Sequence, residues 1–172
     1  MCPNLAHSER SSRPAGVRDV PGALIARLAC VAGLIAPPLA RVALAVPFLR
    51  SGLTKWNGFL TLSPTAQFLF EEQFKLHLFG RTYDFPAPDV IASIDSVAEI
   101  LLPCLLIVGL GTRLSALGIL IMTAVIQLTV PEGWANFHLP WAALAVAIIA
   151  LGPGRVSLDF WIARALAKRW QA

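Results

Sequence analysis

Charged residues are scarce in this sequence. They make up 14% of its 172 residues, whereas 56% of the residues are hydrophobic. A soluble domain needs more polar surface than this composition supplies. The composition therefore argues against an ordinary soluble protein, and the length suits a single integral membrane domain.

Several signatures of chemistry are also missing. The three cysteines, Cys2, Cys30 and Cys104, form no Cys-X-X-Cys pair, and the three histidines have no metal-ligand spacing. We therefore predict free thiols and no metal site, and we find no haem-ligand pair or flavin motif. Lysine and arginine outnumber aspartate and glutamate by 14 to 10, but no basic run is interleaved with aromatics, so we expect no nucleic-acid partner.

Long apolar runs are present instead, and they predict membrane-spanning helices. The predicted spans cover about 39–56, 90–110, 114–130 and 138–152. The connections at 111–113 and 131–137 are short, so the last three spans should be antiparallel neighbours. The predicted fold is all-α, an integral membrane four-helix bundle within residues 21–160.

Shorter segments flank the predicted spans. Residues 1–20 are polar and predict a disordered cytoplasmic tail. Residues 23–36 are too few to cross a hydrocarbon core of about 30 Å. Because Pro37 and Pro38 follow, we predict an extra N-terminal interfacial helix there; a kinked continuation into the first span is the alternative.

Two amphipathic surface helices are also predicted. One covers residues 66–79 and follows an N-cap at Ser63. The other covers 157–172, with Ser157 as its N-cap. Arginines before the first span, at position 113 and after the fourth span predict that both termini are cytoplasmic, because cytoplasmic loops collect positive charge.

Polar side chains at membrane depth lie toward the outer ends of the predicted spans. At 1.5 Å per residue, Lys55 lies level with Asp95, and Arg50 lies level with Glu99. The candidate polar pocket consists of Arg50, Lys55, Asp95, Glu99, Gln127 and His138, with Phe48 and Gly52 as lining residues.

Helical phase separates the two cations of the first span. Lys55 shares a stripe with Phe48 and Gly52, whereas Arg50 lies about 140° away from Lys55 at 100° per residue and can snorkel outward. A charge in hydrocarbon costs about 2.5 kcal/mol or more, so these groups must be paired or hydrated. Two interpretations stay open: a structural ion-pair layer, or a pocket for a small polar substrate, a quinone head group or a proton relay.

The residues at this point resemble the DoxX family. Arg41, Phe48, Gly52 and Lys55 are similar to the pattern of that family's first span. Residues 98–122 resemble its second and third spans, and LGPGRVSLD (151–159) resembles its ending. The matching positions in residues 98–122 are Glu99, Gly109, Thr112 and Arg113. The resemblance covers about 38–160 and departs at Ser51, where many relatives carry histidine.

The resemblance implies a four-span protein of the bacterial inner membrane. Some members are similar to the membrane subunit of thiosulfate:quinone oxidoreductase, and others are membrane partners in thiol or oxidative-stress defence. Some accompany peptide-modifying enzymes linked to metal handling. We therefore expect a membrane subunit or accessory factor of a redox system, with quinone as a possible ligand and no intrinsic cofactor.

Three functions stay open on the sequence. In a quinone-linked subunit, Lys55 would polarise a carbonyl and Glu99 would handle a proton. A non-enzymatic anchor or assembly factor would use its surface helices to bind a soluble or membrane oxidoreductase or a biosynthetic enzyme. A small-solute permease with four spans would have to act as a homo-oligomer.

Overall fold

The computed structural model describes residues 20–58 and 61–170. The predicted disordered tail, apart from Val20, lies outside the described residues. The helices are α1 (Val20–Thr54), α2 (Pro64–Phe68), α3 (Pro88–Val108), α4 (Thr112–Thr129), α5 (Leu139–Leu151) and α6 (Leu158–Arg169). Shorter elements are η1 (Leu69–Gln73), η2 (Pro131–Gly133) and η3 (Trp134–His138), with strands β1 (Leu76–Leu78) and β2 (Arg81–Tyr83).

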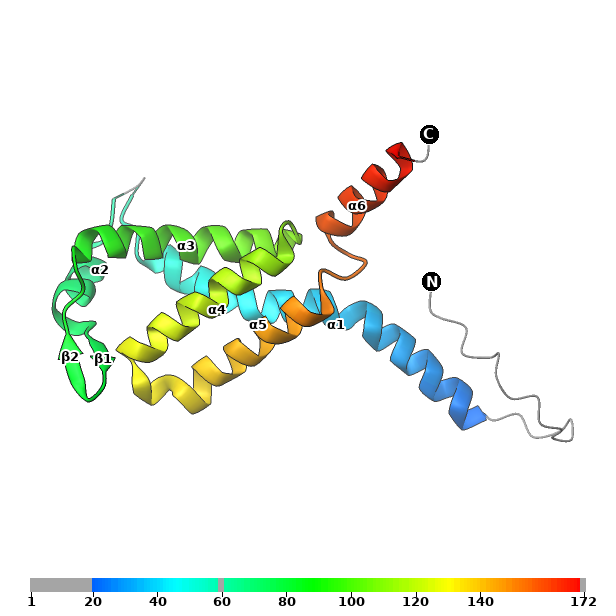
Figure 1. Cartoon of the computed structure of the whole chain (residues 1–172), viewed down its shortest axis with the longest axis horizontal. Coiled ribbons are helices and arrows are strands. Elements are labelled where there is room, and N and C mark those ends of the chain that lie inside the picture. Colours follow the sequence, from blue (N-terminus) through cyan, green and yellow to red (C-terminus); the bar gives the residue numbers. More distant parts are fainter. Residues whose placement is uncertain (1–19, 59–60, 171–172) are drawn as a thin grey trace, which may run out of the picture.

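Four helical segments of the described chain are long and apolar enough to cross a membrane. They are Leu24–Thr54, Pro88–Val108, Thr112–Thr129 and Pro131–Leu151. The bundle of α1, α3, α4 and α5 forms the body of the molecule (Figure 1). The predicted all-α integral membrane fold is confirmed. Its fourth span reaches further toward its N-terminus than predicted, because η2 and η3 lead into α5.

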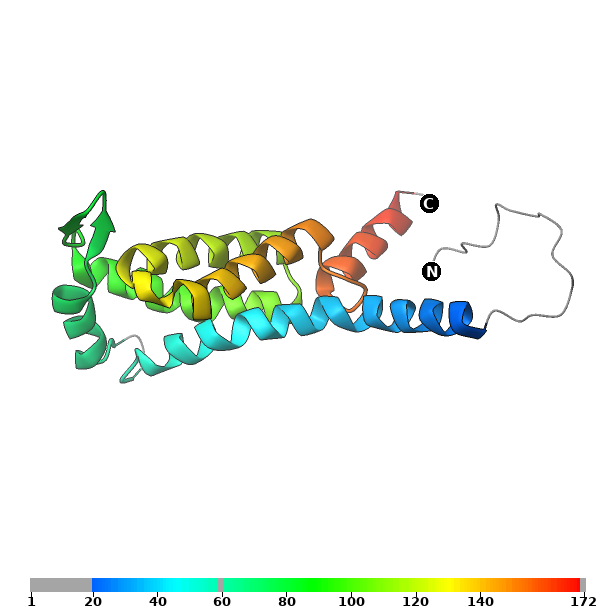
Figure 2. The same ribbon diagram turned by 90° about the horizontal axis from the view of Figure 1, so that it is seen from below.

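The N-terminal helix differs from the preferred prediction. Residues 23–36 and 39–56 are not two helices, because α1 runs unbroken from Val20 to Thr54 with Pro37, Pro38 and Pro47 inside it. Prolines can be accommodated within a long helix by a bend. At 1.5 Å per residue, the 35 residues extend about 52 Å, more than a bilayer core. The N-terminal half therefore projects beyond the other three spans (Figure 2).

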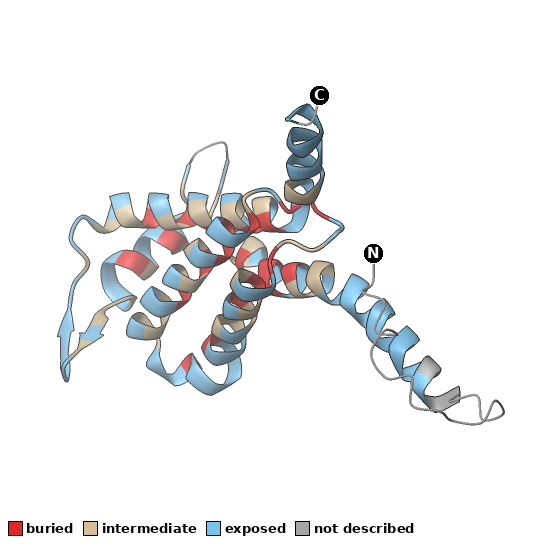
Figure 3. Cartoon of the chain, turned by 45° about the vertical axis from the view of Figure 1, so that its right-hand side comes forward, coloured by how far each residue is buried: buried red, intermediate tan, exposed pale blue. Residues whose placement is uncertain are grey.

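The core lies between the four spanning helices. Leu44 and Phe48 of α1 pack with Leu106 of α3, Ile119 of α4 and Ile148 of α5. Figure 3 shows buried residues along these inner faces, whereas residues 24–36 of α1 and residues 161–169 of α6 are exposed. Leu24, Ile25, Leu28, Val31, Leu34 and Ile35 are among the exposed apolar residues of α1.

A cap of short elements covers the end of the bundle where α1 finishes. The predicted surface helix 66–79 is wrong beyond Gln73, because β1 follows and pairs antiparallel with β2, Leu76 opposite Tyr83. The turn between them is Phe79–Gly80, with φ of 52° and 75°. Two residues at positive φ suit the tight turns of β-hairpins, so a hairpin occupies the second half of the predicted helix.

Both predicted N-caps are present. The Ala66 amide donates to the Ser63 hydroxyl at 3.2 Å, and the Phe160 amide donates to the Ser157 hydroxyl at 3.2 Å. The predicted C-terminal helix is α6, which has no buried residue. The prediction of three free thiols is wrong for Cys30, which is disulfide-bonded, whereas Cys104 is a free thiol.

Candidate functional site

The candidate site begins at the end of α1, where Lys55 meets two carboxylates of α3. Lys55 Nζ lies 2.5 Å from Asp95 Oδ2 and 2.8 Å from Glu99 Oε2. Asp95 and Glu99 are four residues apart, so they share one face of α3. The same ammonium lies 5.2 Å from the centre of the Phe70 ring, within the range of a cation–π contact. We call Lys55, Asp95 and Glu99 the ion triad.

The ion triad forms part of the wall of a cavity of about 490 Å³. The ion pairs of Lys55 and a cavity are therefore both present at this place. The cavity lies between α1, α3, α4 and α5 and beneath α2 and η1. Its lining is mostly apolar and includes the aromatic residues Phe48, Phe70, Phe74, Phe85 and Trp141. Phe48 and Trp141 also pack together, with ring centres 5.0 Å apart.

Gly52 does not line this cavity but allows α1 to approach α3. A methyl group at Gly52 would lie 2.9 Å from Glu99 Cβ and 2.9 Å from Ile100 Cγ1. Real Cβ atoms do not approach so closely, so any larger residue would push the two helices apart. The glycine thus holds the backbone of α1 against the turn of α3 that carries Glu99.

The other three candidate residues lie elsewhere. Arg50 is exposed on α1 and makes no contact with the ion triad in the described part of the chain. His138 is buried, and its Nδ1 lies 2.6 Å from Gln127 Oε1, which links the start of α5 to the end of α4. Neither Gln127 nor His138 lines the cavity. Arg50, Gln127 and His138 are predicted at a depth in the membrane similar to that of the ion triad, but their side chains face other neighbours.

The described part of the chain contains no cluster of side chains that could bind a metal ion. No group of three or more histidine, cysteine, aspartate or glutamate side chains there has an arrangement that could hold one. The ion triad supplies two carboxylates and an ammonium, and the ammonium repels a metal cation. The ion triad instead offers hydrogen-bonding groups beside an aromatic cavity.

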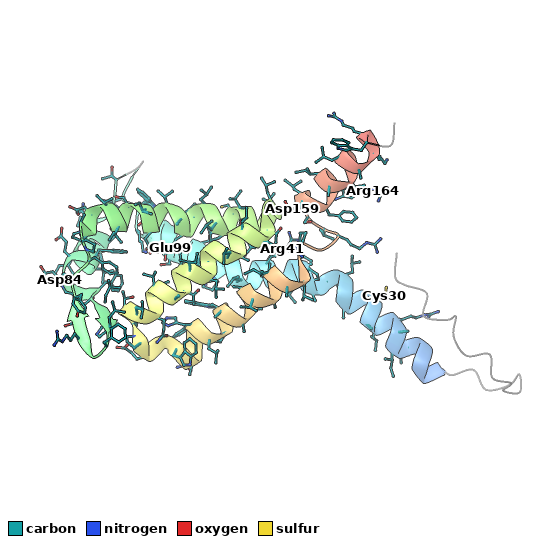
Figure 4. All side chains as sticks on the ribbon, in the orientation of Figure 1. Cys30, Arg41, Asp84, Glu99, Asp159 and Arg164 are labelled. Carbon is teal, nitrogen blue, oxygen red and sulfur yellow. The ribbon has the colours of Figure 1, made fainter. Side chains whose placement is uncertain are left out.

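A second polar cluster lies at the opposite end of the bundle, where α6 begins (Figure 4). Arg41 is only 2% exposed, and its guanidinium donates to the Val156 carbonyl. The carboxylate of Asp159 accepts from the amides of Gly111 and Thr112, both at 2.8 Å. Asp159 therefore caps the N-terminus of α4 from another helix, where an anion is favoured. We call this cluster the clasp.

Gly109 closes the clasp. Its backbone has φ of +78°, and its carbonyl accepts from the Asp159 amide at 2.9 Å. A Cβ at this position would clash with Arg41 Nη1 and would lie 2.6 Å from Ser157 Cβ. The clasp therefore joins α1, the turn between α3 and α4, and the start of α6 through contacts that leave no room for a side chain.

The charge of Asp159 depends on this arrangement. Burial alone would raise the pKa of its carboxyl, but the hydrogen bonds from Thr112 and Gly111 and the nearby Arg41 guanidinium lower the pKa below its usual value of 3.8. A carboxyl whose pKa is lower in the folded state stabilises the fold above its unfolded pKa. This contribution is lost as the pH falls through the folded pKa.

We expect this linkage to be measurable with Asp159→Asn. At pH 7 the variant should unfold with a free energy about 1–3 kcal/mol lower than that of the unsubstituted protein, because hydrogen bonds to a charged acceptor are lost. The difference should begin to shrink as the pH falls below about 3.8, where the carboxyl of the unfolded chain becomes protonated, and it should go on shrinking toward the lower pKa of the folded state. Unfolding in detergent, followed by circular dichroism from pH 7 to pH 3, measures it. A difference that stays constant over this range would contradict the assignment.

The sequence alone does not reveal the clasp, although it marks most of the residues that form it. Arg41, Gly109 and Thr112 belong to the DoxX-like pattern, and Asp159 ends the LGPGRVSLD stretch (151–159) that resembles the family's ending. No spacing in the sequence indicates that residues 41, 109 and 159 meet. The pattern thus divides into two places: Phe48, Gly52, Lys55 and Glu99 lie where α1 meets α3 beside the cavity, whereas Arg41, Gly109 and Thr112 lie at the clasp.

One protein family resembles this chain over more than half of its length. The DoxX family model matches residues 36–132, which hold the ion triad, the turn at Gly109 and most of the cavity lining. No curated protein and no solved structure matches the chain. The matched region is more than half of the 172 residues. The chain therefore belongs to the DoxX family and is a multi-pass integral membrane protein.

Proposed function

We propose that the protein binds the ring of a quinone in the cavity beside the ion triad and serves as the membrane subunit or accessory factor of a redox system. The observation that carries the proposal is the combination of an aromatic cavity with a buried, charged group in its wall. Most small-molecule sites combine an apolar lining with a few convergent polar groups in this way.

The cavity has the size and lining that an aromatic head group requires. Its volume of about 490 Å³ falls within the range of small-molecule sites. Flat rings of Phe48, Phe70 and Trp141 suit stacking against another flat ring. Its position among four spanning helices suits a ligand that arrives from the lipid phase.

The ion triad suits proton exchange with such a ligand. Reduction of a quinone to a quinol takes two electrons and two protons. Asp95 and Glu99 are the groups in the wall that can carry a proton, and Lys55 neutralises one of their two charges. The electrons would come from a partner; with a dithiol donor the balance is dithiol plus quinone giving disulfide plus quinol.

Binding of duroquinone, a tetramethylbenzoquinone, tests the proposal directly. We expect duroquinone to quench the fluorescence of the detergent-solubilised protein in a saturable manner, because Trp141 lies in the cavity wall. Trp141→Phe should remove most of the saturable component. Absence of saturable quenching in the unsubstituted protein, with equilibrium dialysis also showing no binding, would overturn the proposal.

Matched lysine variants give the control. Lys55→Met should weaken duroquinone binding about tenfold or more, because it rearranges the cavity wall. Lys75→Met should leave the binding unchanged, since Lys75 pairs with the exposed Asp84 at 2.7 Å and lines no part of the cavity. Equal affinities for the two variants would place the ligand elsewhere.

A second candidate function is a non-enzymatic membrane anchor or assembly factor. The observation that favours it is the exposed apolar surface of α6, which includes Trp161, Ile162 and Leu166. In that case the ion triad would only fix the packing of α1 against α3. Recovery of a stable protein partner from detergent, and its loss on deletion of residues 157–172, would support this function. A permease is the third candidate.

The cellular setting is part of the same proposal. We place the protein in a bacterial inner membrane with both termini in the cytoplasm, so that the clasp lies at the cytoplasmic end and the cavity at the outer end. Arg113, Arg155 and Arg164 support this orientation through the positive-inside rule. Cysteine labelling at positions 172 and 132 with a membrane-impermeant reagent would test it.

A further inference from the structure

We infer that the cavity selects a ring ligand that donates a hydrogen bond, and so holds the reduced quinol more tightly than the oxidised quinone. The inference rests on the proposed function and specifies the ligand form. It differs from the expectation drawn from the sequence, in which Lys55 donates to a quinone carbonyl.

The first step is that Lys55 is already engaged. An ammonium has three N–H groups. Asp95 Oδ2 at 2.5 Å and Glu99 Oε2 at 2.8 Å occupy two of its sides, and the face of Phe70 lies at 5.2 Å on another. The lysine side chain is only 12% exposed. A carbonyl oxygen from a ligand would have to displace one of these partners to accept from Lys55.

The second step is that the two carboxylates have acceptor capacity to spare. Together they offer about eight lone-pair directions. Lys55 contributes two contacts, and the Ser51 hydroxyl interacts with Glu99. Among the described residues, Glu99 Oε2 has its contact with Lys55 Nζ at 2.8 Å and accepts no further hydrogen bond. The remaining lone pairs of this buried carboxylate can accept from a hydroxyl group of a ligand.

The third step is that this acceptor belongs to the cavity. The Glu99 side chain is only 4% exposed and lines the cavity, together with Asp95 and the aromatic rings. With both carboxylates ionised, the ion triad places one net negative charge in the wall. A hydroxyl group satisfies an acceptor and lies favourably beside a negative charge, whereas a carbonyl oxygen is repelled by it. A quinol presents hydroxyl groups where a quinone presents carbonyl oxygens.

The experiment compares probes that differ in this one property. Equilibrium dialysis under anaerobic conditions measures the affinity of the detergent-solubilised full chain for duroquinol and duroquinone. A redox-inert pair, 2,3,5-trimethylphenol and its methyl ether, repeats the comparison. We expect the hydroxyl-bearing member of each pair to bind about tenfold tighter or more, as for other hydrogen bonds to a charged acceptor.

Variants assign the preference to the ion triad. The Glu99→Gln variant should reduce, several-fold, the ratio of the affinity for duroquinol to the affinity for duroquinone. The combined Asp95→Asn and Glu99→Gln variant should bind duroquinone more tightly than duroquinol, because Lys55 is then free to donate. Asp84→Asn, which neutralises an exposed carboxylate outside the cavity, should leave the ratio unchanged.

The possible results separate this inference from the proposed function. If all four probes fail to bind, the proposed function fails with the inference. If duroquinone binds the unsubstituted protein as tightly as duroquinol, or more tightly, the inference is overturned while the proposed function stands. A preference for the hydroxyl-bearing probes that survives in Glu99→Gln and in the combined variant would also overturn it. The ratio in the unsubstituted protein is measurable whether or not the variants fold.

Discussion

Replacing Gly109 by alanine should lower the free energy of unfolding by about 2–5 kcal/mol. The new methyl group would clash with Arg41 Nη1 and lie 2.6 Å from Ser157 Cβ, so Arg41 and the start of α6 must move. Overpacking of this kind costs about 1–3 kcal/mol. The left-handed backbone of Gly109 adds about 1–2 kcal/mol for any residue with a Cβ.

Two other glycines serve as matched controls. Gly111 also has a positive φ, of 57°, but a Cβ there meets nothing within 4 Å, so Gly111→Ala should cost only about 1–2 kcal/mol. Gly33 lies within α1 with open space around it, and Gly33→Ala should be neutral or slightly stabilising. Thermal unfolding in detergent measures all three. Equal losses for Gly109→Ala and Gly111→Ala would show that the clasp is not closely packed.

The second large effect should come from Lys55→Met. The substitution leaves the carboxylates of Asp95 and Glu99, 23% and 4% exposed, without their cation. Removing one partner of a buried ion pair costs about 3–5 kcal/mol. For a chain of this size each kcal/mol corresponds to about 2–4 °C in the unfolding midpoint. We therefore expect a decrease of roughly 6–20 °C, read by circular dichroism in detergent.

Neutralising the carboxylates should reverse most of this loss. Lys55→Met combined with Asp95→Asn and Glu99→Gln removes the uncompensated charge while keeping similar side-chain volumes. Lys75→Met, which breaks an ion pair to the exposed Asp84, should change stability by less than about 1 kcal/mol. A Lys55→Met variant no less stable than Lys75→Met would mean that the ion triad is hydrated and loosely held.

Stability and function make different demands on the ion triad. An ion pair buried beside an aromatic cavity is weak evidence for stabilisation, because desolvation offsets its attraction. The combined variant with all three groups neutralised should therefore fold, yet lose the preference for a hydroxyl-bearing ligand. A variant that still folds but has lost the ligand preference would show that the ion triad is a binding site and not a layer of ion pairs that only fixes helix packing.

Helical phase indicates which side of α1 each of its residues occupies. Phe48 and Lys55 line the cavity, whereas Gly52, predicted as a lining residue, makes the α1–α3 contact, and Arg50, a candidate pocket residue, is exposed. These positions depend only on the 100° rotation per residue within one helix. Depth counting is less informative: it matches Arg50 with Glu99, but two residues at one depth can face different neighbours. Gln127 and His138 likewise share the layer and contact each other instead of the ion triad.

The sequence by itself determined the class, the four spans and both N-caps. Hydrophobic length and local capping chemistry act over a few residues, so a linear reading captures them. Only the tertiary structure decided that α1 continues through three prolines, that a hairpin replaces the end of the predicted surface helix, and that Arg41, Gly109 and Asp159 form the clasp. It also decided that Lys55 faces both carboxylates. The side-chain contacts of the ion triad and the clasp join residues 40 to 115 positions apart. Their energies depend on packing between helices, which no local pattern encodes.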